Sequence, residues 1–160
     1  MRLLAIDPGN IQSAYCIVDT EDRQPLDFGK VDNQQLVNML STMYASHVAI
    51  EWISSYGMAV GREVFDTCRW VGRFQEALVV YDGTEAELIE RRVVKLHHCN
   101  SSRAKDANIT QALVDRFAPG QPNHGKGTKA APGWFYGFKA DIWAAYALAV
   151  YVADQRAEVS

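Results

Sequence analysis

The stretch that decides the fold lies at the start of the chain and reads Leu3-Leu4-Ala5-Ile6-Asp7-Pro8-Gly9. Its four apolar residues predict a buried strand. Pro8 and Gly9 end that strand, because proline donates no ladder hydrogen bond and glycine permits a tight reversal. Aspartate is disfavoured inside strands and is rarely buried without a partner. We therefore expect Asp7 at the edge of a rigid sheet, facing a turn, where it binds a metal ion or a phosphate-bound metal.

Two further carboxylates occupy comparable positions. The apolar run at residues 47–52 carries Glu51 near its end, and Asp141 opens an apolar helical stretch after a glycine-rich segment. Mg²⁺ and Mn²⁺ prefer oxygen ligands. Three carboxylates at the ends of separate elements therefore predict a divalent-cation site. Taken singly, each has a plainer interpretation as a turn residue, a solvated strand end or a helix N-terminal acid.

The order of the predicted elements indicates a mixed α/β fold. Apolar runs bounded by turn residues predict strands at residues 3–7, 13–18, 25–31, 48–51 and 87–90. Helical spacing of apolar residues predicts helices at residues 33–44, 60–80, 102–117 and 141–155, and a helical turn is expected at residues 93–98. The first three strands form an antiparallel meander, and helical crossovers lead to the later ones. No linker or repeat divides the chain, so residues 1–160 are predicted to form one domain, with a long loop at 118–137.

The composition, with 48% hydrophobic and 22% charged residues, is typical of a soluble globular protein. No apolar run is long enough for a membrane span, and no signal peptide is expected. The cysteines Cys16, Cys68 and Cys99 are odd in number and lack metal-ligand spacing, which favours reduced thiols and a cytoplasmic location. The net charge of −3 does not exclude nucleic-acid binding, because binding depends on local patches.

The order of the acids, with Asp on the first strand, Glu on the fourth and Asp at the last helix, resembles the ribonuclease H-like (retroviral integrase) superfamily. Residues 5–9 (AIDPG), 49–51 (AIE) and 145–149 (AYALA) resemble the RuvC-type Holliday junction resolvases, and residues 103–109 and 127–129 resemble a phage or prophage branch of that group. The resemblance implies a ribonuclease H-like mixed five-stranded sheet, with its first three strands antiparallel, flanked by helices.

The same resemblance implies an endodeoxyribonuclease that hydrolyses phosphodiester bonds in branched DNA such as Holliday junctions. Its catalytic and metal-binding residues would be Asp7, Glu51 and Asp141, holding Mg²⁺ or Mn²⁺. Two ions about 3.5–4 Å apart suit this chemistry, because one activates the attacking water and the other stabilises the leaving oxygen. Asp7 is expected to bridge the two ions, with Glu51 on one and Asp141 on the other.

One position departs from the RuvC pattern. RuvC proteins commonly carry two acids one helical turn apart at the start of the last helix, whereas Asp141 is followed three positions later by Ala144 and four positions later by Ala145. The site then uses three carboxylates, or recruits Asp106 or water as a fourth ligand. The place of Asp106 near a helix start favours stabilisation of that helix terminus instead.

Basic and aromatic residues near the predicted site supply the expected contacts to DNA. The predicted nucleic-acid-binding residues are Arg92, Lys95, Arg103, Lys105, Lys129 and Tyr56. Arg91 belongs to the same basic cluster. Phosphate contacts would make binding steeply salt-dependent, and Tyr56 would stack or wedge at a DNA branch. The plainer alternatives are a solvated charged face and a tyrosine packed in its own loop.

The helix predicted at residues 60–80 carries Phe65, Trp70 and Phe74 besides its aliphatic stripe. This is more apolar surface than one core face requires, so we expect a homodimer, which would supply two active sites for cutting two strands. Two other functions stay open. One is a ribonuclease H-like nuclease acting on RNA or an RNA–DNA hybrid, and the other is a non-catalytic nucleic-acid-binding module.

Overall fold

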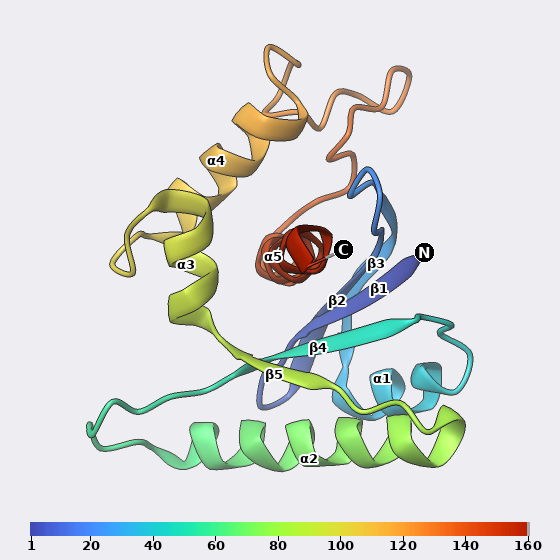
Figure 1. Cartoon of the computed structure of the whole chain (residues 1–160), viewed down its shortest axis with the longest axis vertical. Helices are drawn as coiled ribbons and strands as arrows, with labels where there is room; N and C mark the ends of the chain where they lie inside the picture. Colours follow the sequence, from blue (N-terminus) through green and yellow to red (C-terminus); the bar gives the residue numbers. More distant parts are fainter. Residues whose placement is uncertain (160) are drawn as a thin grey trace.

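The computed structural model describes residues 1–159; Ser160, the last residue of the predicted domain, lies outside the described residues. Within them, one mixed sheet (Figure 1) contains β1 (Arg2–Asp7), β2 (Gln12–Asp19), β3 (Pro25–Asp32), β4 (His47–Trp52) and β5 (Glu87–Glu90). The strand order is β3-β2-β1-β4-β5. The β1–β2 and β2–β3 pairs are antiparallel, and the β1–β4 and β4–β5 pairs are parallel. The predicted fold class is confirmed.

Strand β1 lies in the middle of the sheet because both of its faces are apolar. Leu3 and Ala5 pack into the core on one side, while Leu4 and Ile6 pack into the core on the other. All four side chains are fully buried. Strands buried on both faces read as continuous hydrophobic runs rather than alternating ones. Asp7 therefore stands at the end of the central strand of the sheet.

Helices cover both faces of the sheet (Figure 1). They are α1 (Asn33–Leu40), α2 (Arg62–Asp82), α3 (Arg91–Cys99), α4 (Asp106–Phe117) and α5 (Ile142–Val159). Helices α1 and α2 pack on one face, and α5 packs on the other between the sheet and the α3–α4 pair. Helix α5 is apolar nearly all round, as expected for a helix surrounded by protein. No helix among residues 1–159 is long and apolar enough to cross a membrane.

The bounds of all five helices differ from the sequence prediction, and local contacts or backbone conformation account for three of the ends. Helix α1 ends at Leu40, because the hydroxyls of Ser41 and Thr42 donate to carbonyls of the preceding turn. Helix α3 is a full nine-residue helix that ends where Asn100 adopts a left-handed conformation, with φ of 54°. Helix α4 begins at Asp106, where the Asn108 side chain accepts a hydrogen bond from the Lys105 amide and caps the start.

The predicted loop at residues 118–137 forms neither helix nor strand but is well packed. Phe135 and Phe138 from its end are buried against α5. A Cβ on Gly133 would lie 2.3 Å from the Gly125 carbonyl oxygen, so the loop needs glycine there to close on itself. This packing holds the start of α5, and with it Asp141, in a fixed place.

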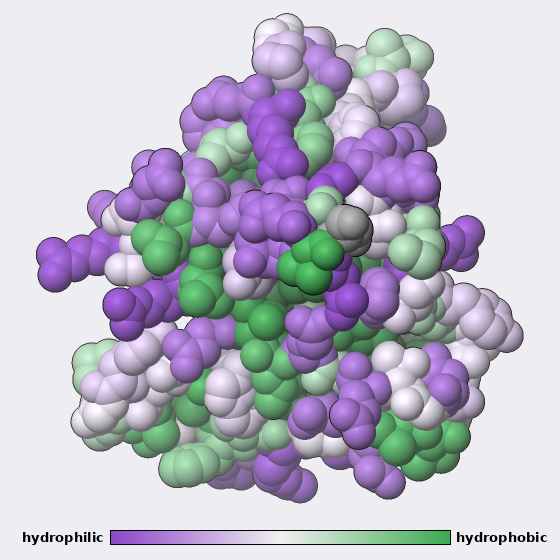
Figure 2. Space-filling view, in the orientation of Figure 1, coloured by the Kyte–Doolittle hydropathy of each residue, from purple (hydrophilic) through white to green (hydrophobic). Residues whose placement is uncertain are grey.

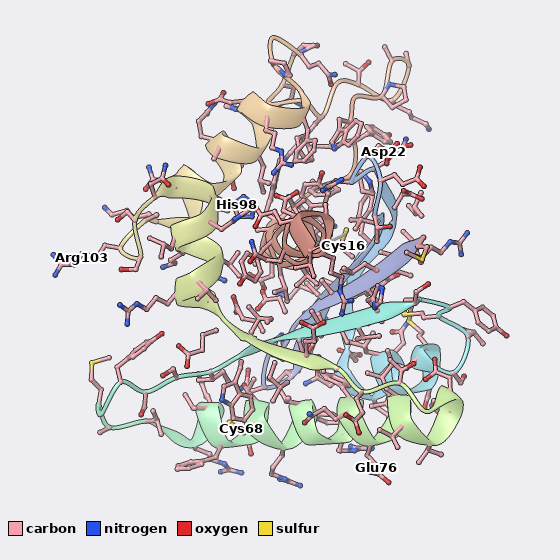
Figure 3. The ribbon with its side chains drawn as sticks, in the orientation of Figure 1. Cys16, Asp22, Cys68, Glu76, His98 and Arg103 are labelled. Atoms are coloured by element: carbon pink, nitrogen blue, oxygen red, sulfur yellow. The ribbon has the colours of Figure 1, made fainter. Side chains whose placement is uncertain are left out.

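The three cysteines are free thiols: Cys16 is buried, and Cys68 and Cys99 are partly buried. Figure 3 shows Cys16 directed toward α5, where it joins the hydrophobic core.

The aromatic residues of α2 do not share one role. Phe74 is fully buried in the chain's own core, so the prediction that it contributes excess surface for a partner is wrong. Trp70 is partly buried, with the Arg73 guanidinium 4.3 Å from the centre of its ring. Phe65 is 61% exposed. Helical periodicity could not separate these three, because the core takes residues from a wide stripe of a long helix.

Candidate active site

A buried hydrogen-bond network fixes the turn that follows Asp7. The Gly9 amide donates to Ser13 Oγ at 3.1 Å, Ser13 Oγ donates to Asn33 Oδ1 at 2.6 Å, and Asn33 Nδ2 donates to the Gly9 carbonyl at 2.8 Å. Both Ser13 and Asn33 are buried. A Cβ on Gly9 would lie 2.2 Å from the Gln12 carbonyl oxygen, so only glycine fits this reversal. The turn therefore sets the end of β1 and the direction of Asp7.

Asp7 and Glu51 stand side by side at the ends of two parallel strands. The register pairs Ile6 of β1 with Ile50 of β4, which places the next residue of each strand at the same edge. Burial raises the pKa of Asp7 well above its ordinary value, and the adjacent Glu51 raises it further by its charge and by a side-chain hydrogen bond. Asp7 and Glu51 therefore form a close pair of acids at this edge of the sheet.

The other groups near Asp7 are charged. Arg91 lowers the pKa of Asp7, and the negative charge of Asp141 raises it, so the third predicted carboxylate acts on the same group. Among residues 1–159, no basic side chain forms an ion pair with Asp7. A bound cation would favour the ionised form of such a partly buried pair of acids.

Glu51 and Asp141 each face a basic partner. Arg91, the first residue of α3, donates from Nη1 to Glu51 Oε1 at 2.9 Å and from Nη2 to Asp106 Oδ1. Lys30 of β3 donates from Nζ to Asp141 Oδ2 at 2.6 Å. In this arrangement no three His, Cys, Asp or Glu side chains of residues 1–159 are grouped closely enough to hold one metal ion. The convergence of Asp7, Glu51 and Asp141 on one ion stays a prediction.

Two of these contacts were not predicted from the sequence. Arg91 was assigned to the DNA-facing basic cluster, but it points inward to Glu51 and Asp106. No sequence pattern predicts the contact of Lys30 with Asp141. The two residues are 111 positions apart, and they meet only because β3 pairs with β2 and the loop before α5 packs as it does.

Two hollows adjoin the carboxylates. A cleft of about 320 Å³ beside Glu51 is lined by Ile53, Ser54, Tyr56, Arg91, Arg92, Lys95 and Ser102. A smaller cavity of about 80 Å³ is lined by Arg91, Asp106, Ile109, Thr110, Ala140, Asp141, Trp143 and Ala144. Three of the six predicted DNA-contacting residues, Tyr56, Arg92 and Lys95, therefore border one cleft at the predicted active site. The Tyr56 hydroxyl donates to Glu90 Oε2 at 3.1 Å across its rim.

The remaining three predicted DNA-contacting residues lie outside both hollows. Arg103 and Lys105 are exposed on the turn between α3 and α4, and Figure 3 shows Arg103 extended into solvent. Lys129 is exposed on the loop before α5. These positions leave the phosphate contacts of all three as a prediction.

Comparison with known proteins rests on structure alone, since no family model and no curated protein matches the chain. A structure of RuvC from Thermus thermophilus superposes with a TM-score of 0.70 at 16% identity, covering 99% of this chain and 97% of that one. The fold is that of RuvC. The T. thermophilus RuvC complex with a Holliday junction substrate superposes with a TM-score of 0.62 at 15% identity, covering 97% and 96%. The fowlpox virus Holliday junction resolvase gives 0.58 at 10% identity, covering 99% of each chain.

The three predicted ligands lie at one end of the molecule. Asp7 and Glu51 lie at the C-terminal ends of β1 and β4, and Asp141 immediately precedes α5. A pocket of about 590 Å³ lies at the other end of the same elements and is lined in part by His47, Glu87 and Tyr151. Figure 2 shows hydrophobic surface near the end of α5 on this face. None of the three predicted ligands lines that pocket.

Proposed function

We propose that the chain is a divalent-cation-dependent endodeoxyribonuclease that cleaves branched DNA, such as a Holliday junction, by phosphodiester hydrolysis. The observation that carries the proposal is the placement of Asp7 and Glu51 side by side at the ends of two paired parallel strands, with Asp141 just before α5 close enough to act on Asp7 by its charge. The RuvC fold supports it, because two of the similar structures are a junction complex and a junction resolvase. We further propose that residues 1–160 act as one domain in the reducing cytoplasm.

Asp7, Glu51 and Asp141 fit Mg²⁺ or Mn²⁺ because all three are carboxylates, the donors that hard cations prefer. The bound cation supplies an activated water and stabilises charge on the phosphate. Asp7 and Glu51 would hold the cation, and Asp141 would join them when its exposed contact with Lys30 opens. Lys30 would then be free to contact a phosphate group of the substrate.

The DNA backbone is proposed to follow the cleft beside Glu51. Arg92 and Lys95 place positive charge along this cleft, and Tyr56 offers a ring on which a base can stack. Arg103, Lys105 and Lys129 extend the basic surface to either side. The chain as a whole has a net charge of −3, but these side chains make the surface positive where the phosphates would approach.

A homodimer is proposed to present two such sites to one junction. With Phe74 in the core, the partner-facing surface of α2 is assigned to Phe65, together with the exposed edge of Trp70. An apolar ring left in water on a long surface helix favours burial against a second copy.

A substrate panel tests the proposed function. The protein in Mg²⁺ is expected to cleave a synthetic four-way DNA junction in preference to linear duplex of the same sequence. Preferential cleavage of an RNA–DNA hybrid would support the alternative ribonuclease H-like activity. Junction binding with no cleavage in Mg²⁺ or Mn²⁺ would support a non-catalytic binding module.

A further inference from the structure

The site holds an unusual balance of charge for a pair of divalent ions. Four carboxylates surround it, those of Asp7, Glu51, Asp106 and Asp141, while Arg91 and Lys30 form ion pairs with three of them. With Asp7 ionised, four negative charges meet two positive ones. With Lys30 in place, one divalent cation neutralises the remaining two negative charges. When Lys30 leaves Asp141, one divalent cation leaves a single negative charge, and a second would still leave an excess of positive charge before substrate arrives.

Arg91 is a fixed part of this balance. Its guanidinium joins carboxylates from two elements, with Glu51 Oε1 on Nη1 and Asp106 Oδ1 on Nη2. The Arg91 side chain is only 33% exposed and that of Glu51 only 15%. An arginine stays charged at any working pH, and its planar fork binds two acceptors in a set geometry.

Lys30 has the same exposed fraction as Arg91, 33%, but makes a weaker set of contacts. Its ammonium makes one contact, to Asp141, whose side chain is 52% exposed. An exposed single-contact ion pair contributes little and exchanges readily with solvent. Lys30 can therefore leave Asp141 to a cation, whereas Arg91 stays between Glu51 and Asp106.

The contacts of Arg91 also occupy the oxygens that a second ion would need. Asp7 and the second oxygen of Glu51 remain for one cation. The other Glu51 oxygen, Oε1, accepts a hydrogen bond from the Arg91 guanidinium, and the Asp106 carboxylate accepts a second one from the same group. Ala144, one turn into α5, lines the same small cavity and offers no ligand.

We propose that the site binds one divalent cation, at Asp7, Glu51 and Asp141, and that Arg91 is a resident cation in place of a second ion between Glu51 and Asp106. This inference rests on the proposed nuclease function and revises the expectation of two ions. Arg91 would supply its single positive charge without metal exchange, and Asp106 would position Arg91 rather than bind metal.

Counting bound Mn²⁺ tests the proposal independently of cleavage. Metal-free protein is titrated with Mn²⁺, and free ion is followed by electron paramagnetic resonance. The wild-type chain is expected to bind one ion that is lost in Asp7→Asn. Arg91→Met, which keeps the length of the side chain and removes its charge, is expected to bind two. Arg92→Met, an exposed change at the next position, is the matched control and is expected to bind one.

Each other outcome overturns a defined claim. Two Mn²⁺ ions in the wild type, both lost in Asp7→Asn while junction cleavage persists in the wild type, would overturn the resident cation and leave the nuclease proposal standing. One ion in a folded Arg91→Met would overturn it too. If Arg91→Met does not fold, the wild-type count decides alone. A wild type that neither binds Mn²⁺ nor cleaves would overturn the nuclease proposal itself.

Discussion

At the scale of single residues, the ionised carboxylate of Asp7 lowers the stability of the folded chain, which a purely structural aspartate would not do. Its pKa is raised in the folded chain by burial and by Glu51, so the unfolded chain loses this proton at lower pH than the folded one. The folded state is therefore destabilised as pH rises above the ordinary aspartate value. A residue that weakens its own fold at neutral pH is typical of functional sites.

Asp154 shows the opposite behaviour, in a cluster on the far part of α5. Burial alone would raise the pKa of Asp154, but hydrogen bonds from Arg116, His97 and Arg23 outweigh it and lower the pKa to about 2. Because the folded-state pKa is depressed, this stabilisation is present above about pH 4 and is lost as pH falls toward 2.

Asp154→Asn is therefore expected to lower the free energy of unfolding at pH 7 by about 2 kcal/mol, since one pKa unit corresponds to about 1.4 kcal/mol. The difference between variant and wild type should shrink on acidification below about pH 4. Urea unfolding at several pH values measures both. Asp115→Asn, an exposed change on α4, should have little effect, and equal unfolding curves for Asp154→Asn and wild type at pH 7 would contradict the assignment.

At the scale of elements, the sequence was sufficient for the strands that carry Asp7 and Glu51. Continuous apolar runs predicted β1 and β4, and parallel pairing of buried strands brings their ends together. The partners of the carboxylates were not predictable, because Arg91 and Lys30 reach them only through the start of α3 and the register of β3. The start of α4 could not be predicted from apolar spacing either. The hydrogen bond from the Lys105 amide to the Asn108 side chain decides that this helix begins at Asp106.

Helix α3 is the element proposed to hold the DNA backbone. Arg92→Ala and Lys95→Ala should each weaken junction binding and reduce the slope of log affinity against log salt by about 1, because each removes one phosphate contact. Fluorescence anisotropy at several salt concentrations measures the slope. An unchanged slope in both variants would mean that these side chains face solvent in the complex.

At the scale of the whole molecule, the sequence predicted the mixed sheet and its flanking helices, because the order of apolar runs leaves few topologies that bury them. It could not assign the aromatic residues of α2. Phe65, Trp70 and Phe74 have the same apolar character, and only the packing of α2 on α1 and the sheet separates the buried ring from the exposed one.

Phe65→Glu is expected to yield monomers, since the charge would be buried against the partner in the proposed homodimer. Sedimentation velocity at micromolar concentration measures the state. Tyr44→Glu, a change at a tyrosine that is 78% exposed outside α2, is the control and should leave the dimer intact. A wild-type protein that sediments only as a monomer, alone and on a junction, would end the dimer proposal without touching the nuclease proposal.

The most direct test of the central claim compares wild type and Asp7→Asn on a four-way DNA junction in Mg²⁺. Asp7→Asn is nearly isosteric and removes the carboxylate with the raised pKa, so the variant should be at least as stable as wild type without metal. It should bind the junction with comparable affinity and cleave at least about 100-fold more slowly, the upper range for losing even an indirect metal contact. Asp7→Asn cleaving at the wild-type rate would contradict the account.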